Sequence, residues 1–227
     1  MSGDVQTVVA ARSLIGKRSC FIGVGRPSTA AILARMVHNP ELVLVYESGT
    51  IGAKPYRVPL SIGDGELAET ADLVVSVPEM FNYWIGPGRV QVAFLGAAQV
   101  DRHANLNSTV IGDYDRPRTR LPGAGGAPEI ATGCGEVVVI VPHSRRTFVE
   151  QLDFQTTTGA RATAVITDLG VLEPRGGELT LTALHPGVSV EQAREATGWE
   201  LRVADAVATT EPPTGEELRA LEELVAR

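Results

Sequence analysis

The sequence predicts an α/β protein with an open, mostly parallel sheet flanked by helices and an antiparallel hairpin at its C-terminal end. Short apolar runs alternate with helical patterns through the first half of the chain, as in βαβ units. Turn residues close these runs at their C-terminal ends, which is typical of parallel strands. Past residue 160, two β-rich runs flank the turn signal at residues 174–177. With no repeat in the sequence, we expect a single domain over residues 1–227.

Helices and strands are expected to alternate in the first half of the chain. The expected order is a helix over 4–15, a strand over 19–22, a helix over 29–37, a strand over 42–46, a strand over 73–75, a helix over 78–85 and a strand over 91–95. The stretch 53–65 is rich in proline and glycine. It is long for a loop of a compact domain, so we expect it to be functional or to face a partner.

The second half begins with an irregular segment, expected over residues 102–128. The elements expected after it are a strand over 137–141, a hairpin formed by 163–172 and 178–184, a helix over 190–197, a linker over 209–214 and a terminal helix over 215–226.

Composition excludes several classes of function. A net charge of −7 argues against nucleic acid or an anionic membrane as partner, and the sequence has no apolar run of the length of a membrane span. The N-terminus lacks the pattern of a signal peptide. Cys20 and Cys134 do not form a disulfide framework and are expected as small core residues. We therefore expect a cytoplasmic protein.

Glu47 stands at the end of a predicted buried strand. The apolar run 43–46 is followed by Glu47, Ser48 and Gly49, so the carboxylate should lie at the carboxyl end of a parallel strand. In open α/β sheets, ligands bind at that edge. Glu47 is therefore either a solvated loop charge or a carboxylate that takes part in chemistry.

A first glycine-rich turn runs from Gly23 to Ser28. It resembles a dinucleotide-binding fingerprint without its third glycine, and Glu47 follows at about the spacing of the ribose-binding acid of that motif. However, Ser28 replaces the small residue needed for close packing, and Pro27 lacks a backbone N–H. A tight turn that uses Gly23 and Gly25 for backbone freedom, or another ligand role, is the simpler interpretation.

A second glycine-rich turn covers residues 123–127. Its glycines, including Gly125 and Gly126 before Ala127, allow backbone N–H groups to converge on an anion or an oxyanion. A flexible surface loop is the alternative.

Other chemical signatures are missing from the sequence. Ser48 is not in a Gly-x-Ser-x-Gly elbow, the four histidines have no metal-ligand spacing, and we expect no metal. Arg145 and Arg146 follow a predicted strand; a solvated turn is the simpler interpretation, and contact with an acidic ligand or partner is the alternative. A carboxylate is already ionised at neutral pH and can act as a nucleophile without a base, which makes Glu47 the candidate.

Spaced segments over nearly the whole chain resemble the β subunit of class I coenzyme A transferases. Residues 47–49 are similar to the catalytic Glu-(Ser/Asn)-Gly element of that family, and residues 23–28 to its Gly-x-Gly-x-Pro-(Ser/Thr) turn. Further similar segments, several of them typical of the glutaconate-type branch, are 95–101 with Asn105 and Asn107, 111–114 with Pro117, 125–127, 167–173 and 185–188.

Within this family, residues 52–55 and 60–71 are most similar to the branch that acts on 3-oxoadipate, and glutaconate transferases share most of the same skeleton. One departure lies after Thr158 and Gly159. The relatives carry a longer loop there, whereas here residues 160–162 lead almost directly into the hairpin strand.

The resemblance implies a CoA-transferase-like fold and the transfer of CoA between an acyl-CoA, with succinyl-CoA favoured, and a short dicarboxylic or 3-oxo acid, with 3-oxoadipate favoured. It implies that Glu47 forms a glutamyl-CoA thioester. The implied oxyanion and CoA contacts are Gly125, Gly126 and Ala127, and the implied substrate and CoA loops contain Gly23, Gly25, Pro27, Ser48, Gly49, Gln99, Asn105 and Asn107.

CoA enters as a substrate, and the resemblance implies no tightly bound cofactor. It also implies an α subunit that completes the active site in a hetero-oligomer such as α2β2, without which this chain is inactive. Three alternatives stay open: a glutaconate-type transferase, an acyl-CoA hydrolase or carbon–carbon bond cleaving enzyme on the same fold, and a dinucleotide-binding or scaffolding subunit.

Overall fold

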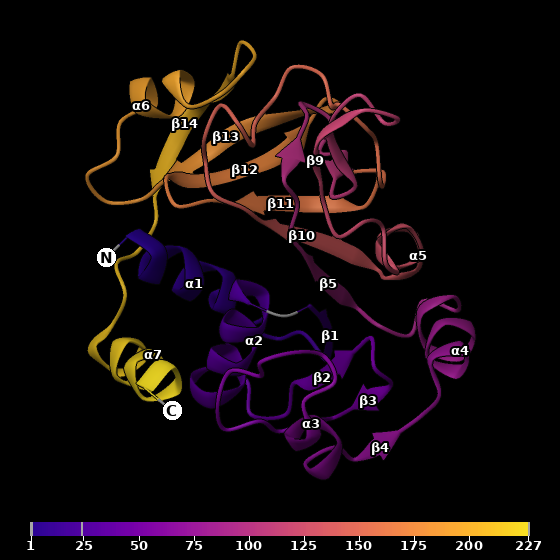
Figure 1. Ribbon diagram of the computed structural model, residues 1–227. Helices are drawn as coiled ribbons and strands as arrows, with labels where there is room; N and C mark the ends of the chain where they lie inside the picture. Colours follow the sequence, from indigo (N-terminus) through magenta and orange to yellow (C-terminus); the bar gives the residue numbers. More distant parts are fainter. Residues whose placement is uncertain (1, 24, 227) are drawn as a thin grey trace. The chain divides into compact units, whose positions relative to one another are not determined.

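The computed structural model describes residues 2–23 and 25–226 (Figure 1). The chain divides into two compact units. Unit 1 comprises Met1–Leu95, Gly133–Gly135 and Pro212–Arg227, and unit 2 comprises Gly96–Thr132 and Glu136–Glu211. Both units are of mixed α/β composition, as the sequence predicts. Within the described residues, no helix combines the length and the apolar character needed to cross a membrane.

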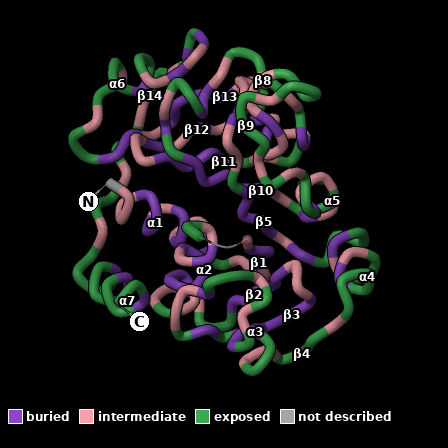
Figure 2. Tube along the Cα trace, in the orientation of Figure 1, coloured by how far each residue is buried: buried purple, intermediate pink, exposed green. Residues whose placement is uncertain are grey.

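In unit 1, the central strands run parallel. Strand β1 (Ser19–Ile22) pairs in parallel with β2 (Val43–Tyr46) on one side and with β5 (Val92–Leu95) on the other. This confirms the strands predicted from the apolar runs. The sheet continues past β2 through the antiparallel strands β3 (Thr50–Ile51) and β4 (Leu73–Val74). Most residues of β1, β2 and β5 are buried, which explains their continuous apolar sequence (Figure 2).

Helices pack together beside this sheet. Helix α2 (Arg26–Val37) contacts both α1 (Ser2–Arg12) and α7 (Gly215–Ala226), and it buries a run of alanine, isoleucine and leucine side chains. The remaining elements of unit 1 are α3 (Gly65–Glu69), α4 (Val77–Glu79) and the π-helix η1 (Met80–Ile85). Cys20 and Cys134 are both buried, so their assignment to the core is confirmed.

In unit 2, the sheet is mixed. Strands β10 (Glu136–Ile140) and β11 (Ala162–Ile166) are parallel, β12 (Gly170–Arg175) runs antiparallel to β11, and β13 (Glu178–Leu184) runs antiparallel to β12. The last strand, β14 (Arg202–Thr209), lies parallel to β13. Two small ribbons join β6 (Gln99–Val100) to β7 (Leu106–Asn107) and β8 (Val110–Gly112) to β9 (Pro117–Arg120). The helices are α5 (Ala127–Gly133), at the end of the glycine-rich turn, and α6 (Val190–Glu195).

The hairpin around residues 176–177 is confirmed, but its first strand was wrongly predicted as one element over 163–172. The structure divides this segment into β11 and β12, which pair with each other. The reversal between them depends on Thr167: its hydroxyl accepts from the backbone N–H of Leu169 and of Gly170 and donates to the Gly170 carbonyl. A threonine inside a β-rich run is a poor turn signal in the sequence, which explains the error.

Other differences concern short or weakly patterned elements. Strand β14 was not predicted, because most of its residues are partly or fully exposed and it contains alanine and aspartate, which are uncommon in strands. The segment 102–128, expected to be irregular, contains β7, β8 and β9. The first helix ends at Arg12 rather than at residue 15.

Candidate active site

Glu47 occupies a tight turn that directly follows β2. The backbone N–H of Gly49 donates to the carbonyl of Tyr46 over 3.0 Å, so Glu47 and Ser48 are the two central residues of a β-turn. The chain then returns as β3, where Ile51 pairs with Val45. The carboxylate-bearing residue is half-buried. The turn thus fixes the backbone of Glu47 at the carboxyl end of a parallel strand.

Gly49 is required by the shape of this turn. Its φ of 99° lies in the region that favours glycine, and a Cβ atom at this position would lie 1.9 Å from the carbonyl oxygen of Val75. The backbone N–H of Val75 also donates to the Gly49 carbonyl over 2.9 Å. The segment after β4 is therefore pressed against the turn that carries Glu47, and any side chain at Gly49 would displace it.

The first glycine-rich turn lies beside Glu47. Ile22 and Tyr46 are register partners in adjacent parallel strands, so Gly23 and Glu47 leave the sheet at the same edge, about one strand spacing of 4.8 Å apart. Gly25 caps α2 with a φ of 82°. Apart from their own chain neighbours, no described residue places an atom within 4 Å of a Cβ built at Gly23 or Gly25.

Ser28 explains why this turn departs from a dinucleotide fingerprint. Its side chain is fully buried, and its hydroxyl shares a hydrogen bond of 3.2 Å with the hydroxyl of Tyr46. Burial raises the pKa of the Tyr46 phenol to about 12, although the hydrogen bond with Ser28 acts in the opposite direction. A glycine or alanine at position 28 would leave this buried phenol without that partner. Pro27 lies in the first turn of α2.

Two hydroxyls of the same turn region are buried and lack a partner. Ser48 Oγ and Thr50 Oγ1 make no hydrogen bond to the residues that the structure describes. Buried polar groups normally have a hydrogen-bond partner, so the two unsatisfied hydroxyls set the turn after β2 apart from an ordinary buried turn.

In unit 2, Gln99 and Asn107 form a hydrogen-bonded network. Asn107 Nδ2 donates to Gln99 Oε1 over 2.7 Å and to the Val110 carbonyl over 2.7 Å. Gln99 Nε2 donates to Asp153 Oδ2 over 2.8 Å. Asn107 is fully buried and Gln99 is 5% exposed. The contacts of Asn107 are structural, and its predicted role in a substrate loop stays a prediction.

Asn105 is bonded to Gly159, which precedes the loop of residues 160–162 that we expect to be shorter than in related proteins. Its Oδ1 accepts from the backbone N–H of Gly159 over 3.0 Å, and its Nδ2 donates to Asp101. A Cβ atom on Gly159 would lie 2.3 Å from the carbonyl oxygen of His103. The shortened loop is therefore packed directly on the segment that follows β6.

The turn before α5 contains the predicted oxyanion donors. Gly125 has a φ of 50°, and the backbone N–H of Ala127 donates to the Ala124 carbonyl over 3.0 Å. The Gly126 carbonyl accepts from Ile130 within the first turn of α5. In this structure the Ala127 N–H is thus used within the turn, and its service as an oxyanion donor stays a prediction.

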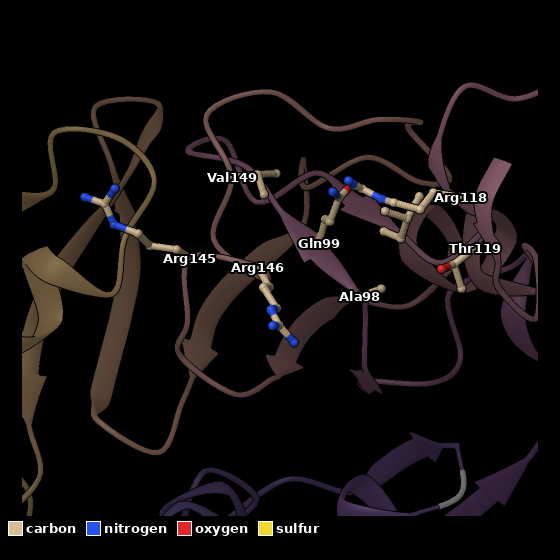
Figure 3. A pocket seen from close by; sticks show the side chains of 8 residues that line it. Ala98, Gln99, Arg118, Thr119, Arg145, Arg146 and Val149 are labelled. Atoms are coloured by element: carbon tan, nitrogen blue, oxygen red, sulfur yellow. The ribbon is translucent and has the colours of Figure 1, made fainter.

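A cavity of about 640 Å³ lies within unit 2 (Figure 3). It is lined by Ala98, Gln99, Ile111, Arg118, Thr119, Arg145, Arg146 and Val149. Gln99 is the predicted site residue that the structure places in this lining. Arg145 and Arg146 were interpreted as a solvated turn; they are exposed, yet they form one wall of the cavity. Arg118 was not predicted as a site residue. No sequence pattern indicates that the ribbon of β8 and β9 and the loop after β10 line the same cavity.

His143 is buried in unit 2 and is not a candidate base. Its ring nitrogens contact the hydroxyls of Thr167 and Thr197 at 3.2 and 3.0 Å, and its ring stacks on Phe148. Burial lowers the pKa of His143 to about 4, with the nearby Asp168 acting weakly in the opposite direction. His143 is therefore neutral at physiological pH and holds three segments of unit 2 together.

These observations define an α/β chain that presents a carboxylate on a strand-end turn, beside the glycine-rich turn that leads into α2. The family model "Coenzyme A transferase" matches residues 6–196. The chain belongs to the coenzyme A transferase family.

Two curated relatives and one solved structure show how far the similarity extends. The chain is 53% identical to the B subunit of 3-oxoadipate CoA-transferase of Pseudomonas knackmussii over 243 aligned residues, covering 100% of this chain and 94% of that protein. It is 30% identical to the B subunit of glutaconate CoA-transferase of Acidaminococcus fermentans, covering 92% and 86%. The crystal structure of glutaconate coenzyme A-transferase from the same organism superimposes with a TM-score of 0.93 at 28% identity, covering 99% and 94%.

The predicted resemblance to this family is thereby confirmed, and so is the assignment of the chain to an enzyme that uses CoA as a substrate. The same matches remove the basis for a dinucleotide-binding or scaffolding role.

Proposed function

We propose that this chain is the β subunit of a CoA-transferase that moves CoA from succinyl-CoA to 3-oxoadipate, with Glu47 as the covalent nucleophile. The observation that supports this most directly is the position of Glu47: a half-buried carboxylate on the turn after β2, beside the glycine-rich turn at Gly23 and Gly25. The full-length similarity to the B subunit of a 3-oxoadipate CoA-transferase supports the choice of acids.

The first half of the reaction moves CoA onto the enzyme. A carboxylate oxygen of Glu47 attacks the acyl carbon of succinyl-CoA, and the C–S bond breaks to give a mixed anhydride and CoA thiolate. The thiolate then attacks the glutamyl carbonyl carbon and expels succinate, which leaves a glutamyl-CoA thioester. No proton has to be removed, because the nucleophile is already an anion.

The second half repeats these steps in reverse with the acceptor. A carboxylate of 3-oxoadipate attacks the thioester carbon, CoA thiolate leaves, and the thiolate attacks the acceptor carbonyl of the new anhydride. This releases 3-oxoadipyl-CoA and restores the Glu47 carboxylate. Each tetrahedral intermediate needs oxyanion donors, and the turn at Gly125, Gly126 and Ala127 is our candidate. Loss of one such donor typically raises the barrier by about 2.7–4 kcal/mol.

An α subunit completes the enzyme in this proposal. The two curated relatives described above are named as the B subunits of their enzymes, which supports a partner of the other type. We propose that the isolated chain is inactive, and that the active form is a hetero-oligomer such as α2β2.

Trapping of the thioester tests the proposal. The complex, produced by co-expression with its α subunit, is incubated with succinyl-CoA and then treated with borohydride. Peptide mass analysis should locate the reduced side chain at Glu47. Modification at another carboxylate, or no modification during active exchange, would contradict the covalent role of Glu47.

A rate measurement distinguishes transfer from hydrolysis. In the proposed reaction, CoA appears on the acceptor at the rate of turnover and free CoA does not accumulate. Release of free CoA without an acceptor, at the turnover rate, would indicate an acyl-CoA hydrolase. A preference for glutaconate over 3-oxoadipate in the same assay would indicate the glutaconate-type activity.

A further inference from the structure

The cavity of unit 2 combines positive charge with unused hydrogen-bond donors. The whole chain carries a net charge of −7, yet three arginines and no carboxylate are among the residues that line this cavity. A concave site with charge of one sign attracts ligands of the opposite sign. The cavity is therefore electrostatically suited to an anion.

Two of the three guanidinium groups are available to a ligand. Arg145 Nε donates to the Glu195 carbonyl over 2.8 Å, and Figure 3 shows its guanidinium turned away from the other labelled side chains. Arg118 and Arg146, in contrast, make no hydrogen bond or ion pair to the described residues. The neighbouring Arg120 donates to the Tyr114 carbonyl and lies over the Tyr114 ring, so it has a structural role that Arg118 lacks.

Gln99 adds a fixed polar group to the same cavity. Its Oε1 accepts from Asn107 Nδ2 and from the backbone N–H of Asp153, and its Nε2 donates to Asp153 Oδ2. An amide nitrogen has two hydrogens, so one donor of Gln99 is left for a ligand. Arg118 and Arg146 line the cavity together with Gln99; in the view of Figure 3 the Arg118 side chain extends toward Gln99, whereas the Arg146 guanidinium is directed away from both.

We propose that this cavity binds a negatively charged carboxylate or phosphate group through Arg118 and Arg146. Guanidinium groups bind carboxylates and phosphates in a bidentate manner. The inference rests on the proposed transferase function, whose substrates carry both kinds of group: the distal carboxylate of the dicarboxylic acids and the phosphates of CoA.

Binding measurements on the assembled complex test the inference without requiring catalysis. Titration calorimetry compares wild type with Arg118→Gln, Arg146→Gln and the double variant. The probes are adipate against hexanoate, which lacks the second carboxylate, and CoA against pantetheine, which lacks the phosphates. We expect each single substitution to weaken binding of the relevant anion tenfold or more.

Each outcome is informative. Weaker binding of adipate with hexanoate unchanged assigns the cavity to the distal carboxylate, and weaker binding of CoA with pantetheine unchanged assigns it to the phosphates. Unchanged binding of all four probes, or equal weakening within both pairs, overturns the inference. If the wild-type complex binds the anions but exchanges no CoA, the proposed function fails while the cavity assignment stands.

Matched variants exclude a general effect of charge or folding. Arg116→Gln removes an exposed arginine close to the same ribbon but outside the cavity lining, and it should leave all four affinities unchanged. Arg118→Lys keeps the positive charge but loses the planar guanidinium, which can donate two parallel hydrogen bonds. It should therefore bind the anions more tightly than Arg118→Gln but less tightly than wild type. Since the side chains of Arg118 and Arg146 are exposed and make no hydrogen bond or ion pair to the described residues, the unfolding temperature of the complex should not change in their variants.

Discussion

The turn after β2 in unit 1 and the network around Gln99 in unit 2 place polar residues in opposite ways. The turn at Glu47 is closed by backbone hydrogen bonds and by the special conformation of Gly49, and the carboxylate-bearing residue stays half-buried. In the network, the side chain of Gln99 is hydrogen-bonded to those of Asn107 and Asp153. These side-chain bonds connect the three segments that carry them.

The difference lies in which groups define the local backbone: main-chain hydrogen bonds in the turn at Glu47, and side-chain amides in the network. Backbone bonds define where Glu47 leaves the sheet, so its carboxylate is not needed to close the turn. The side chain of Asn107, in contrast, is itself part of the structure, because its amide donates to two buried carbonyl oxygens. We therefore expect substitutions at Glu47 to change activity and substitutions in the network to change stability.

The largest expected effect is on catalysis. Glu47→Gln keeps the size of the side chain but removes the anionic nucleophile, and we expect CoA exchange by the complex to fall roughly 10³-fold or more. Glu41→Gln is the control, because Glu41 is exposed near the opposite end of β2. Full activity of the amide variant, without slow deamidation to the acid, would refute the covalent mechanism.

The next effect concerns the turn itself. Gly49→Ala places a Cβ atom against the Val75 carbonyl at a φ of 99°, and we expect it to destabilise the chain by about 4 kcal/mol and to reduce activity as well. Gly65→Ala adds a Cβ atom with no neighbour within 4 Å and should be tolerated. Equal unfolding midpoints for the two variants would show that the turn is not rigid.

A third effect is the pH dependence that His143 gives to unit 2. The pKa of His143 is lowered from 6.5 to about 4 by burial, so between these two pH values the unfolded chain binds a proton that the folded chain does not. This histidine's part of the stability is complete above pH 6.5 and falls by about 3 kcal/mol as the pH reaches 4. Urea unfolding of the complex at several pH values should show a flatter profile for His143→Gln than for wild type. The exposed His103→Gln should keep the wild-type slope.

The smallest effect tests the network directly. Asn107→Ala leaves buried partners such as Gln99 Oε1 and the Val110 carbonyl without a donor, and we expect a loss of about 2 kcal/mol. Exposed Asn82→Ala provides the comparison. If the specific activity of the surviving Asn107→Ala complex also dropped more than tenfold, the assignment of a purely structural role to Asn107 would be refuted.

Much of unit 1 could be predicted from the sequence because its signals are local. The apolar runs of β1, β2 and β5 are continuous, as expected for parallel strands buried on both faces. Glu47 follows one of these runs directly, so its place at the sheet edge was also predictable. The partnership of Ser28 with Tyr46 was not, because it joins two residues eighteen positions apart through a packed interior.

Unit 2 was harder to predict because its polar residues act through distant partners. The turn at Thr167 and the exposed strand β14 lack strong local patterns. Likewise, Asn105 looks like a loop residue, yet it binds Gly159 from 54 positions away.

By itself, the sequence determined the fold class, the parallel strands β1, β2 and β5, the candidate carboxylate Glu47 and membership of the coenzyme A transferase family. All of these depend on residues that are close in the chain, where periodicity and turn chemistry operate. The tertiary structure alone decided that Asn107 is a buried scaffold residue and that Arg118 and Arg146 share one cavity. The physical reason is that burial and the clustering of charges depend on contacts between segments far apart in the chain. A local sequence pattern does not show which of these segments come together.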